Sequence, residues 1–293
     1  MRSRTTLVLL ACIALFATAC GSEASDLTSS AAPAPGETTI DKCVIAQGTT
    51  PEAKATGKDF KTLKKGVLSV GSDTAFPPFE SIEGGKAVGF DVDLVSEVAK
   101  RLGNLEVDYQ TAAFDTIFTA LAAGKWDIVA SAVTIKAERK QTVDFTDPYF
   151  IADLSISVTD ENANEITGVD DLEGKVVGTQ AATTSEDCSK ALQEDGKLSD
   201  VRTYDTAPDA FTDLAAGRVD AVIIDYPTAK QILENRTGSR VVQVVKTQEE
   251  YALAVSKKNP DLREAINDAL AEIKDDGTYA ELFRKWFKTE PPE

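Results

Sequence analysis

The chain has 293 residues, of which 42% are hydrophobic and 27% charged, so it has the composition of a globular protein with ample core. Its 31 Lys and Arg residues against 48 Asp and Glu residues give a net charge of -17, which argues against nucleic acid or an anionic membrane surface as a partner. The sequence contains no histidine, the commonest general base and metal ligand, and we expect neither a metal nor another cofactor.

The N-terminus is typical of an export signal. Two arginines precede an apolar run at residues 7–16 that is too short to span a bilayer, and small residues then lead to Cys20. The pattern resembles a bacterial lipoprotein signal peptide, residues 1–19, which would leave Cys20 as the lipidated first residue. An ordinary secretory peptide cut near Ala19 is the alternative.

The segment after the signal contains one of the two cysteines that would remain free to form a disulfide. Residues 20–61 are predicted to be a lipid-anchored flexible tether and N-terminal extension. Cys12 would leave with the signal, so Cys43 and Cys188 remain in a compartment that permits disulfides. We expect them to form one disulfide, which would fasten the extension to the second half of the chain. Two unpaired, buried cysteines are the alternative.

The first half of the chain alternates between predicted strands and helices. Residues 67–70 form an apolar strand, and the glycine pair at 84–85 marks a turn. A helix with one apolar face follows, capped by Asp91 and closed near Gly103. Residues 113–123 are a second such helix.

A repeat indicates two related halves. Residues 118–127 and 211–220, an offset of 93, are identical at seven of ten positions, and each copy predicts a helix end, a glycine and a short strand at 128–130 or 221–224. Duplicated units at this distance favour two similar α/β lobes, each with its own sheet. Chance similarity of common helix–strand boundaries is the alternative.

The second half continues the pattern. Residues 175–179 are a predicted strand, and two amphipathic helices are predicted at 260–274 and 278–287. Ligands of open α/β sheets bind beyond the carboxyl ends of the strands, where the two copies lead to Arg139 and Asp225. A guanidinium and a carboxylate in one cleft would complement the carboxylate and ammonium of a free amino acid.

Several longer motifs resemble one family, the polar amino-acid-binding proteins of ABC importers, which have the type II periplasmic-binding fold. The matching stretches are 71–80, 88–94, 132–139, 144–149 and 276–279. Residues 73–76 and 285–291 are similar to the glutamine-binding members in particular.

The resemblance implies an architecture that the repeat alone does not supply. It is an α/β fold of two similar lobes joined by a hinge that the chain crosses twice. Lobe 1 would comprise residues 62–150 and 250–290, and lobe 2 residues 151–249. The protein would be an extracytoplasmic receptor, not an enzyme, that captures a polar amino acid between closing lobes and passes it to a membrane permease. We expect a monomer, anchored through the lipid on Cys20.

The resemblance also implies roles for residues that would hold the ligand's amino-acid backbone. Arg139 would bind the carboxylate, helped by Thr134 and by backbone N–H groups near Ser131 and Ala132. Asp225 would bind the ammonium. A surface arginine and a helix-capping aspartate are the alternatives for the two charged residues.

Other residues would contact the ligand's side chain. Phe76 and Phe114 would sandwich its carbons, although aromatic residues at such spacing are more often core. Asp73 would accept a hydrogen bond from a ligand amide or pair with a ligand cation, and it would repel glutamate. Gln180 and Thr184 would add hydrogen bonds to the ligand. This predicts glutamine first and arginine or lysine next, although related glutamine binders carry lysine in place of Gln180.

Nearby residues are predicted to be structural. Five aromatic residues are assigned to the core: Phe79, Phe90, Phe118, Trp126 and Phe145. Capping or packing is expected for Asp91, Asp93 and Asp144, and a structural or rim position for Glu80.

Two other functions compete with binding for transport. The first is an enzyme on the same fold, such as a dehydratase of small carboxylates, whose carboxyl groups would need strongly shifted pKa values to act without histidine. The second is a ligand-sensing lobe, which would need a partner to signal.

Overall fold

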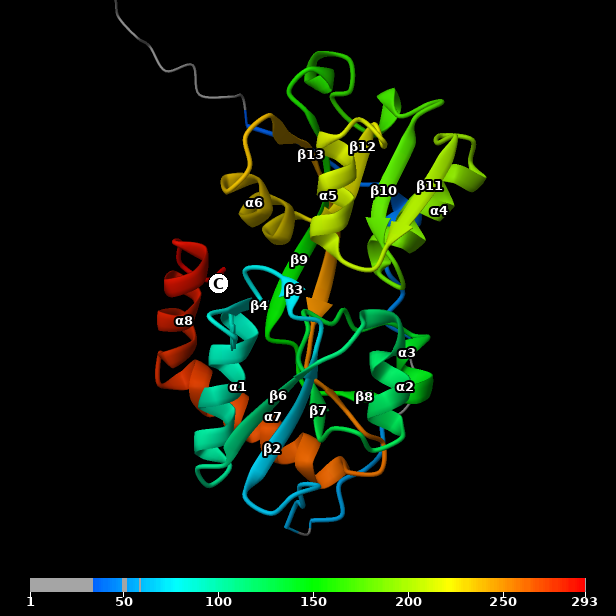
Figure 1. Cartoon of the computed structure of the whole chain (residues 1–293). Helices are drawn as coiled ribbons and strands as arrows, with labels where there is room; N and C mark the ends of the chain where they lie inside the picture. The colour runs from blue at the N-terminus through cyan, green and yellow to red at the C-terminus, as the bar shows by residue number, and fades with distance from the viewer. Residues whose placement is uncertain (1–33, 49–51, 58, 293) are drawn as a thin grey trace, which may run out of the picture. The chain divides into compact units, whose positions relative to one another are not determined.

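The computed structural model describes residues 34–48, 52–57 and 59–292, so the predicted signal peptide and Cys20 lie outside the described residues. Two main sheets divide this part of the chain into two α/β halves (Figure 1). We call the half built on the five-stranded sheet lobe 1 and the half built on the six-stranded sheet lobe 2. The residue limits proposed above for the lobes remain a prediction.

Lobe 1 is built on a sheet whose central strands are buried and apolar. Its strands, in spatial order, are β6 (Glu106–Thr111), β2 (Val67–Ser72), β7 (Ile128–Val129), β14 (Ala254–Val255) and β8 (Asp144–Phe145). A small second sheet consists of β3 (Ala75–Phe76), β4 (Glu80–Glu83) and β5 (Lys86–Val88). The accompanying helices are α1 (Phe90–Arg101), η2 (Phe114–Thr116), α2 (Ile117–Ala122), α3 (Arg139–Thr142), α7 (Pro260–Asp275) and α8 (Thr278–Phe287).

Lobe 2 repeats this plan. Its sheet runs in the order β1 (Gly36–Thr38), β13 (Ser239–Tyr251), β9 (Phe150–Thr159), β12 (Ala221–Asp225), β10 (Val176–Gln180) and β11 (Asp200–Tyr204). Its helices are α4 (Thr184–Glu194), α5 (Ala207–Ala215) and α6 (Tyr226–Glu234), with short 3-10 turns η1 (Asp41–Cys43), η3 (Asn162–Asn164) and η4 (Val169–Asp171).

The repeat found in the sequence corresponds to equivalent positions in the two lobes. In lobe 1, β2 pairs in parallel with β6 and β7, and in lobe 2, β10 pairs in parallel with β11 and β12. The repeated segments are α2 leading into β7 and α5 leading into β12, with Gly124 and Gly217 after the helices at φ 84° and 66°. The predicted fold class, two similar α/β lobes, is therefore confirmed.

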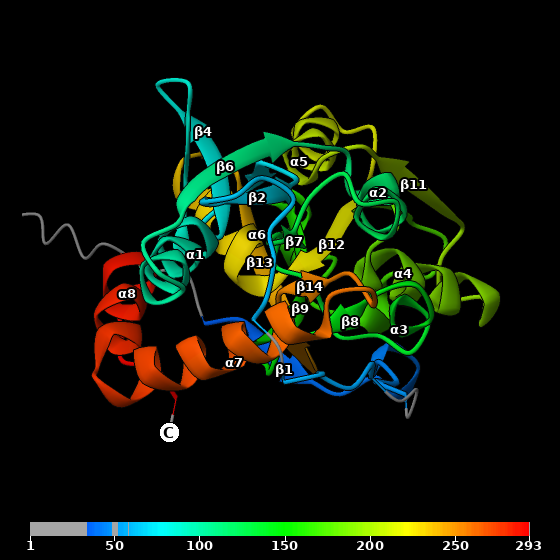
Figure 2. The same ribbon diagram turned by 90° about the horizontal axis from the view of Figure 1, so that it is seen from below.

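Two long antiparallel strands connect the lobes. The chain leaves lobe 1 after β8 and enters lobe 2 through β9, and it returns through β13 to β14 of lobe 1. Figures 1 and 2 show β9 and β13 side by side where the two lobes meet. Both predicted crossings are thus present.

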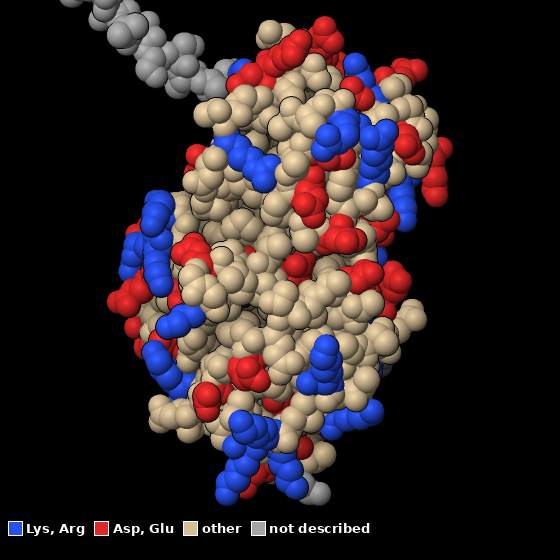
Figure 3. All heavy atoms as spheres, viewed as in Figure 1, with Lys and Arg blue, Asp and Glu red and all other residues tan. Residues whose placement is uncertain are grey.

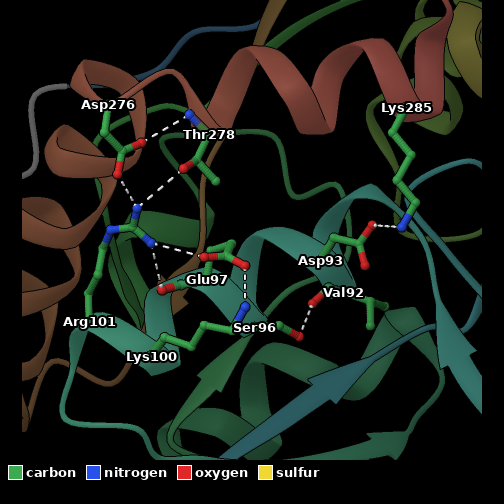
Figure 4. A network of polar contacts seen from close by, with 9 residues as sticks. All are labelled: Val92, Asp93, Ser96, Glu97, Lys100, Arg101, Asp276, Thr278 and Lys285. Atoms are coloured by element: carbon green, nitrogen blue, oxygen red, sulfur yellow. Dashed lines mark hydrogen bonds and ion pairs between the residues drawn. The ribbon is translucent and has the colours of Figure 1, made fainter.

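The last two helices return to lobe 1 and pack on α1 (Figure 4). The Arg101 guanidinium bonds the carboxylate of Asp276 and lies 3.4 Å from the hydroxyl of Thr278. Nearer the start of α1, Lys285 Nζ donates to Asp93 at 2.6 Å. These contacts fix the last two helices to lobe 1.

Two assignments from the sequence need correction. Gly89, at φ 145°, occupies the position before α1, and Asp91 lies within the helix instead of capping it. The buried Asp91 carboxylate accepts hydrogen bonds from the backbone N–H of Ala132 at 2.9 Å and the hydroxyl of Tyr149 at 2.7 Å. Phe118 is only partly buried, and the Arg139 guanidinium lies over its ring; the other four aromatic residues assigned to the core are buried.

The predicted disulfide is present. Cys43, in η1, is bonded to Cys188, in α4, with a Cα–Cα distance of 4.4 Å. Both side chains are buried in an apolar cluster of lobe 2. The bridge closes a loop with a sequence separation of 145 residues.

The segment that carries Cys43 contacts both lobes. Residues 36–38 form β1, which pairs in parallel with β13. Further along, the carbonyl of Ala46 accepts from the N–H of Ala137 at 3.0 Å, and the N–H of Ala53 donates to Asp144 at 2.9 Å, both in lobe 1. The extension is therefore an ordered part of the fold over its described residues.

Replacing both cysteines with serine should lower the melting temperature. Closing so long a loop stabilises by about 4–5 kcal/mol in the chain-entropy model, an upper estimate. The native protein should melt at lower temperature with reductant, and the double variant should not respond to it. Peptide mapping after thiol labelling of unreduced, denatured protein provides the direct check, and labelling of both Cys43 and Cys188 would contradict the bridge.

Candidate ligand-binding site

A cavity with about 300 Å³ of empty space lies where the carboxyl ends of strands from both lobes meet. Asp73 follows β2, Ser131 follows β7, and Gln180 and Asp225 end β10 and β12. Its lining residues are Asp73, Phe76, Phe114, Ser131, Ala132, Thr134, Arg139, Gln180, Thr183, Thr184 and Asp225. All ten residues singled out from the sequence line it, while their roles toward a ligand remain predictions.

Arg139 lies at the start of α3 and is only 7% exposed. Its guanidinium donates to the carbonyl of Thr134 at 2.8 Å and, across the cleft, to the carbonyl of Ala182 at 3.1 Å. It also lies over the rings of Phe114 and Phe118, 5.2 and 5.0 Å from their centroids. Burial lowers the pKa of Arg139, but nearby carboxylates oppose this and an arginine stays protonated in proteins. The cleft therefore contains a fixed, planar cation.

Asp225 supplies a buried carboxyl group from lobe 2. It stands at the position before α6, but its side chain makes no capping hydrogen bond. Its carboxylate instead accepts from the hydroxyl of Tyr251 and lies 3.5 Å from the hydroxyl of Ser185. Burial raises the pKa of Asp225, and Tyr251 and Arg139 oppose this rise. The carboxyl group is thus available to the cavity and not to the helix.

Asp73 and Gln180 meet across the cleft. The Gln180 amide nitrogen donates to the Asp73 carboxylate at 2.6 Å and to the carbonyl of Asp205 at 3.1 Å. Burial raises the pKa of Asp73 to about 6, and the Gln180 hydrogen bond limits the rise. The two lobes are therefore joined here by a hydrogen bond to a buried acidic side chain.

The acidic character extends to the surface around the cleft. On the face shown in Figure 3, Asp and Glu side chains are frequent along the middle of the molecule, where the lobes meet in Figure 1. Lys and Arg side chains gather at the lower end of the same view.

Two alanines with left-handed backbone conformation flank the cavity, one from each lobe. Ala132 follows β7 at φ 46°, and Ala182 follows β10 at φ 61°. The N–H of Ala132 is held by Asp91, and the N–H of Ala182 by Glu186 at 2.6 Å. Such strained residues are frequent at functional sites, where the surrounding structure holds them in place.

The aromatic lining residues come from lobe 1. Phe76 ends β3 and Phe114 begins η2, and both are largely buried with their rings at the cavity. They provide apolar surface between the charged groups, as expected for a site that takes aliphatic carbons.

Two polar residues of this region were not predicted. Thr183 lines the cavity and is the cap of α4, accepting from the N–H of Glu186 at 3.2 Å. Its position directly before Thr184 was a signal that could have found it. Glu249 accepts from the hydroxyls of Thr134 and Thr184, both at 2.7 Å. It stands in a charged run that resembles an exposed segment, so the sequence offered no signal.

The described residues contain no cluster of three or more potential metal ligands. Over the same ranges, none of the helices is both long and apolar enough to cross a membrane.

Residues 68–289 match the model of the bacterial extracellular solute-binding proteins, family 3. The chain belongs to this family. The match begins after Cys43, so the first partner of the disulfide lies before the matched part of the chain.

Individual relatives span the two lobes. The L-cystine-binding protein TcyJ of Escherichia coli (strain K12) is 36% identical over 230 residues, which are 78% of this chain and 85% of TcyJ. A solved ancestral arginine-binding protein bound to arginine is 42% identical with a TM-score of 0.73, over 76% of this chain and 99% of that one. An ancestral arginine-binding protein bound to glutamine is 40% identical with a TM-score of 0.72, over 77% and 100%. A particular closeness to glutamine-binding members stays a prediction.

Proposed function

We propose that this protein is the extracytoplasmic receptor of an ABC importer and that its lobes close around a free polar amino acid. The observation that carries the proposal is the meeting of Arg139 of lobe 1 and Asp225 of lobe 2 at one cavity. A buried guanidinium and a buried carboxyl group together complement the two charges that every free amino acid carries. The relatives are named as cystine- and arginine-binding proteins, which supports a role in binding amino acids.

The ligand carboxylate would lie on the Arg139 fork. Arg139 donates to one carbonyl group of each lobe, so it lies where the two lobes meet. A ligand carboxylate bound there would lie between lobe 1 and lobe 2. Since the N–H of Ala132 is held by Asp91, other backbone N–H groups near Ser131 would complete the anion site, and Asp225 would accept from the ammonium. Charge-assisted bonds of this kind are about twice as strong as neutral ones.

The side-chain end of the site favours a ligand that donates hydrogen bonds. The cavity lining contains two acidic side chains, Asp73 and Asp225, and one cation, Arg139. The two charges of a free amino acid cancel, so a ligand whose side chain carries one positive charge would balance the site. The amide nitrogen of Gln180 is already used by Asp73 and Asp205, which leaves its oxygen as an acceptor. We therefore place arginine first and glutamine second; this balance of charge reverses the order expected from the sequence motifs.

The proposed setting is the outer face of a bacterial cell membrane. The signal-like segment and Cys20 support a lipid anchor, the family supports an extracellular location, and a permease would receive the ligand. We propose that the protein acts as a monomer.

Binding is a better account of the site than catalysis. A dehydratase needs a group that moves a proton, and since the sequence contains no histidine, this task would fall to a carboxyl group of raised pKa such as Asp73. The buried carboxyl groups of the cleft already accept hydrogen bonds from neighbouring side chains. Conversion of an amino acid by the purified protein would favour the enzyme instead. A sensing role would use the same site and needs a partner protein.

A thermal-shift screen of the twenty amino acids tests the proposal. A ligand that binds only the folded state stabilises it by about 2.7 kcal/mol at a hundredfold excess over Kd. We expect the largest shift with arginine, a smaller one with glutamine and none with glutamate. The absence of a shift with any amino acid would contradict the proposed function.

Replacing Asp73 with asparagine should relax the exclusion of acidic side chains. The change removes the negative charge near the ligand's side chain while keeping an acceptor oxygen and the size of the group. We expect arginine to bind more weakly and glutamate to bind measurably, as followed by calorimetry. Tighter glutamate than arginine binding to the native protein would show that the charge of Asp73 does not select the ligand.

A further inference from the structure

Glu249 joins the two lobes beside the cavity without lining it. It lies in β13, one of the two connecting strands, and only 2% of it is exposed. A single carboxyl oxygen, Oε2, accepts from the hydroxyl of Thr134 in lobe 1 and from that of Thr184 at the start of α4 in lobe 2, at 2.7 Å each. Both threonines line the cavity.

A bulge in β13 sets the position of this side chain. Between Val245 and Glu249, β13 advances four residues while β9 advances two. Gln248 adopts φ 52°, and the Asp153 carboxylate accepts from the N–H groups of Thr247 and Gln248 at 3.0 Å each. Bulges of this kind redirect side chains next to functional sites. The bulge therefore directs the Glu249 side chain into the region between the lobes.

The surroundings of Glu249 favour its neutral form. Its second oxygen, Oε1, is buried and makes no hydrogen bond within the part of the chain that the structure describes. The charged and titratable groups around it are Asp225 at the end of β12, Arg139 in α3 and Tyr251 in β13. Burial, and then Asp225, raise the pKa of Glu249 to about 8, against the opposing effects of Thr134, Thr184 and Arg139.

We infer, building on the proposed function, that Glu249 is a positioning residue: its protonated carboxyl group gathers Thr134 and Thr184 as the lobes close on the amino acid. The proton comes from solvent and resides on Oε1, while Oε2 remains the acceptor for both hydroxyls. An ionised Glu249 would instead place a negative charge near the carboxylate that Arg139 holds. Closure on the ligand is therefore coupled to the uptake of one proton.

The coupling has a defined sign. In an open form with Glu249 in water, its pKa returns toward the ordinary value of 4.5, whereas in the closed form it is about 8. Between these two values the closed form binds one more proton, so it loses stability as pH rises. Kd then increases by up to about tenfold per pH unit in this window and levels off above pH 8.

Calorimetry from pH 6 to 9 on the native protein and on Glu249→Gln tests the inference, with L-arginine as the probe. Glutamine keeps an acceptor oxygen for the two hydroxyls but cannot titrate in this range. The ratio of the native Kd to that of Glu249→Gln should therefore rise by about 50-fold between pH 6 and 8. Titration of Asp73 and of the ligand ammonium is common to both proteins and cancels in the ratio.

Two further variants separate positioning from a general structural effect. Glu249→Ala removes the acceptor and should weaken binding at pH 6 at least about tenfold. Glu250→Gln changes the neighbouring acid, which binds the exposed Gln47 side chain, and should keep the native pH profile. Repeating the native titration in two buffers with different heats of ionisation counts the protons taken up, and we expect close to one at pH 7.

The possible outcomes distinguish this inference from the function on which it rests. A constant ratio across the pH range, or native affinity in Glu249→Ala, overturns the role of Glu249 while amino-acid binding stands. If the native protein binds none of the twenty amino acids at any pH, the proposed function falls and the role of Glu249 falls with it. Thermal melts without ligand establish that each variant is folded, and Glu249→Gln alone still decides the question if the alanine variant does not fold.

Discussion

Replacing Arg139 with alanine should weaken amino-acid binding by about 30- to 4000-fold. The loss of one partner from a buried, hydrogen-bonded charge pair costs about 2–5 kcal/mol, and every 1.4 kcal/mol is a factor of ten. The side chain stands at a cavity between lobes and bonds two backbone carbonyls, so its removal should leave both lobes folded. Calorimetry measures the affinity, and a thermal melt without ligand measures the fold.

Two other arginine variants sharpen this test. Arg139→Lys keeps the charge but not the planar fork, so it should bind with intermediate affinity. Arg218→Ala removes an exposed arginine of lobe 2, which pairs with Asp213, and should bind as the native protein does. Near-native affinity in Arg139→Ala would show that Arg139 does not bind the ligand.

Replacing Asp225 with asparagine should weaken binding by about 10- to 150-fold. A hydrogen bond to a charged group contributes about 1.5–3 kcal/mol, and the amide keeps the shape and one acceptor oxygen but not the charge that faces the ligand ammonium. The hydroxyl of Tyr251 can still donate to that oxygen, so the local structure should survive.

The matched control for this change is Asp200→Asn. Asp200 is an exposed aspartate at the start of β11 in the same sheet, away from the carboxyl ends of the strands. It should leave affinity unchanged. If Asp225→Asn binds within about threefold of the native protein, Asp225 does not hold the ammonium.

Much of the fold could be predicted because local pattern and topology agree. The repeated helix, glycine and strand around Gly124 and Gly217 specify one unit twice, and each unit needs a sheet of its own to bury its apolar strand. The two C-terminal helices were also predicted closely, with α8 at Thr278–Phe287, since their apolar faces repeat with helical period.

The lining of the cavity could be predicted for a topological reason. Loops at the carboxyl ends of parallel strands collect at one edge of each sheet, so Arg139 and Asp225 meet although 86 residues separate them in the sequence. The disulfide was expected from the small number of cysteines, but the 4.4 Å approach of the two Cα atoms depends on the path of the N-terminal segment, which carries no periodic pattern.

The residues that were missed or misassigned depend on tertiary contacts. Asp91 looks like a helix cap in the sequence, and only the packing of the loop after β7 brings the N–H of Ala132 to its carboxylate. Glu249 looks like part of an exposed charged run, and only the bulge at Gln248 turns it inward. Local sequence pattern carries no information about either contact.

If the cleft holds a free amino acid as proposed, the ligand's carboxylate and ammonium lie between Arg139 and Asp225. The most direct test compares, by calorimetry in one buffer, the amino acid that binds tightest with its α-carboxamide, such as L-arginine with L-argininamide. We expect the amide to bind at least about 30-fold more weakly, because the guanidinium of Arg139 loses its charged partner. Equal affinity for the acid and the amide would contradict it.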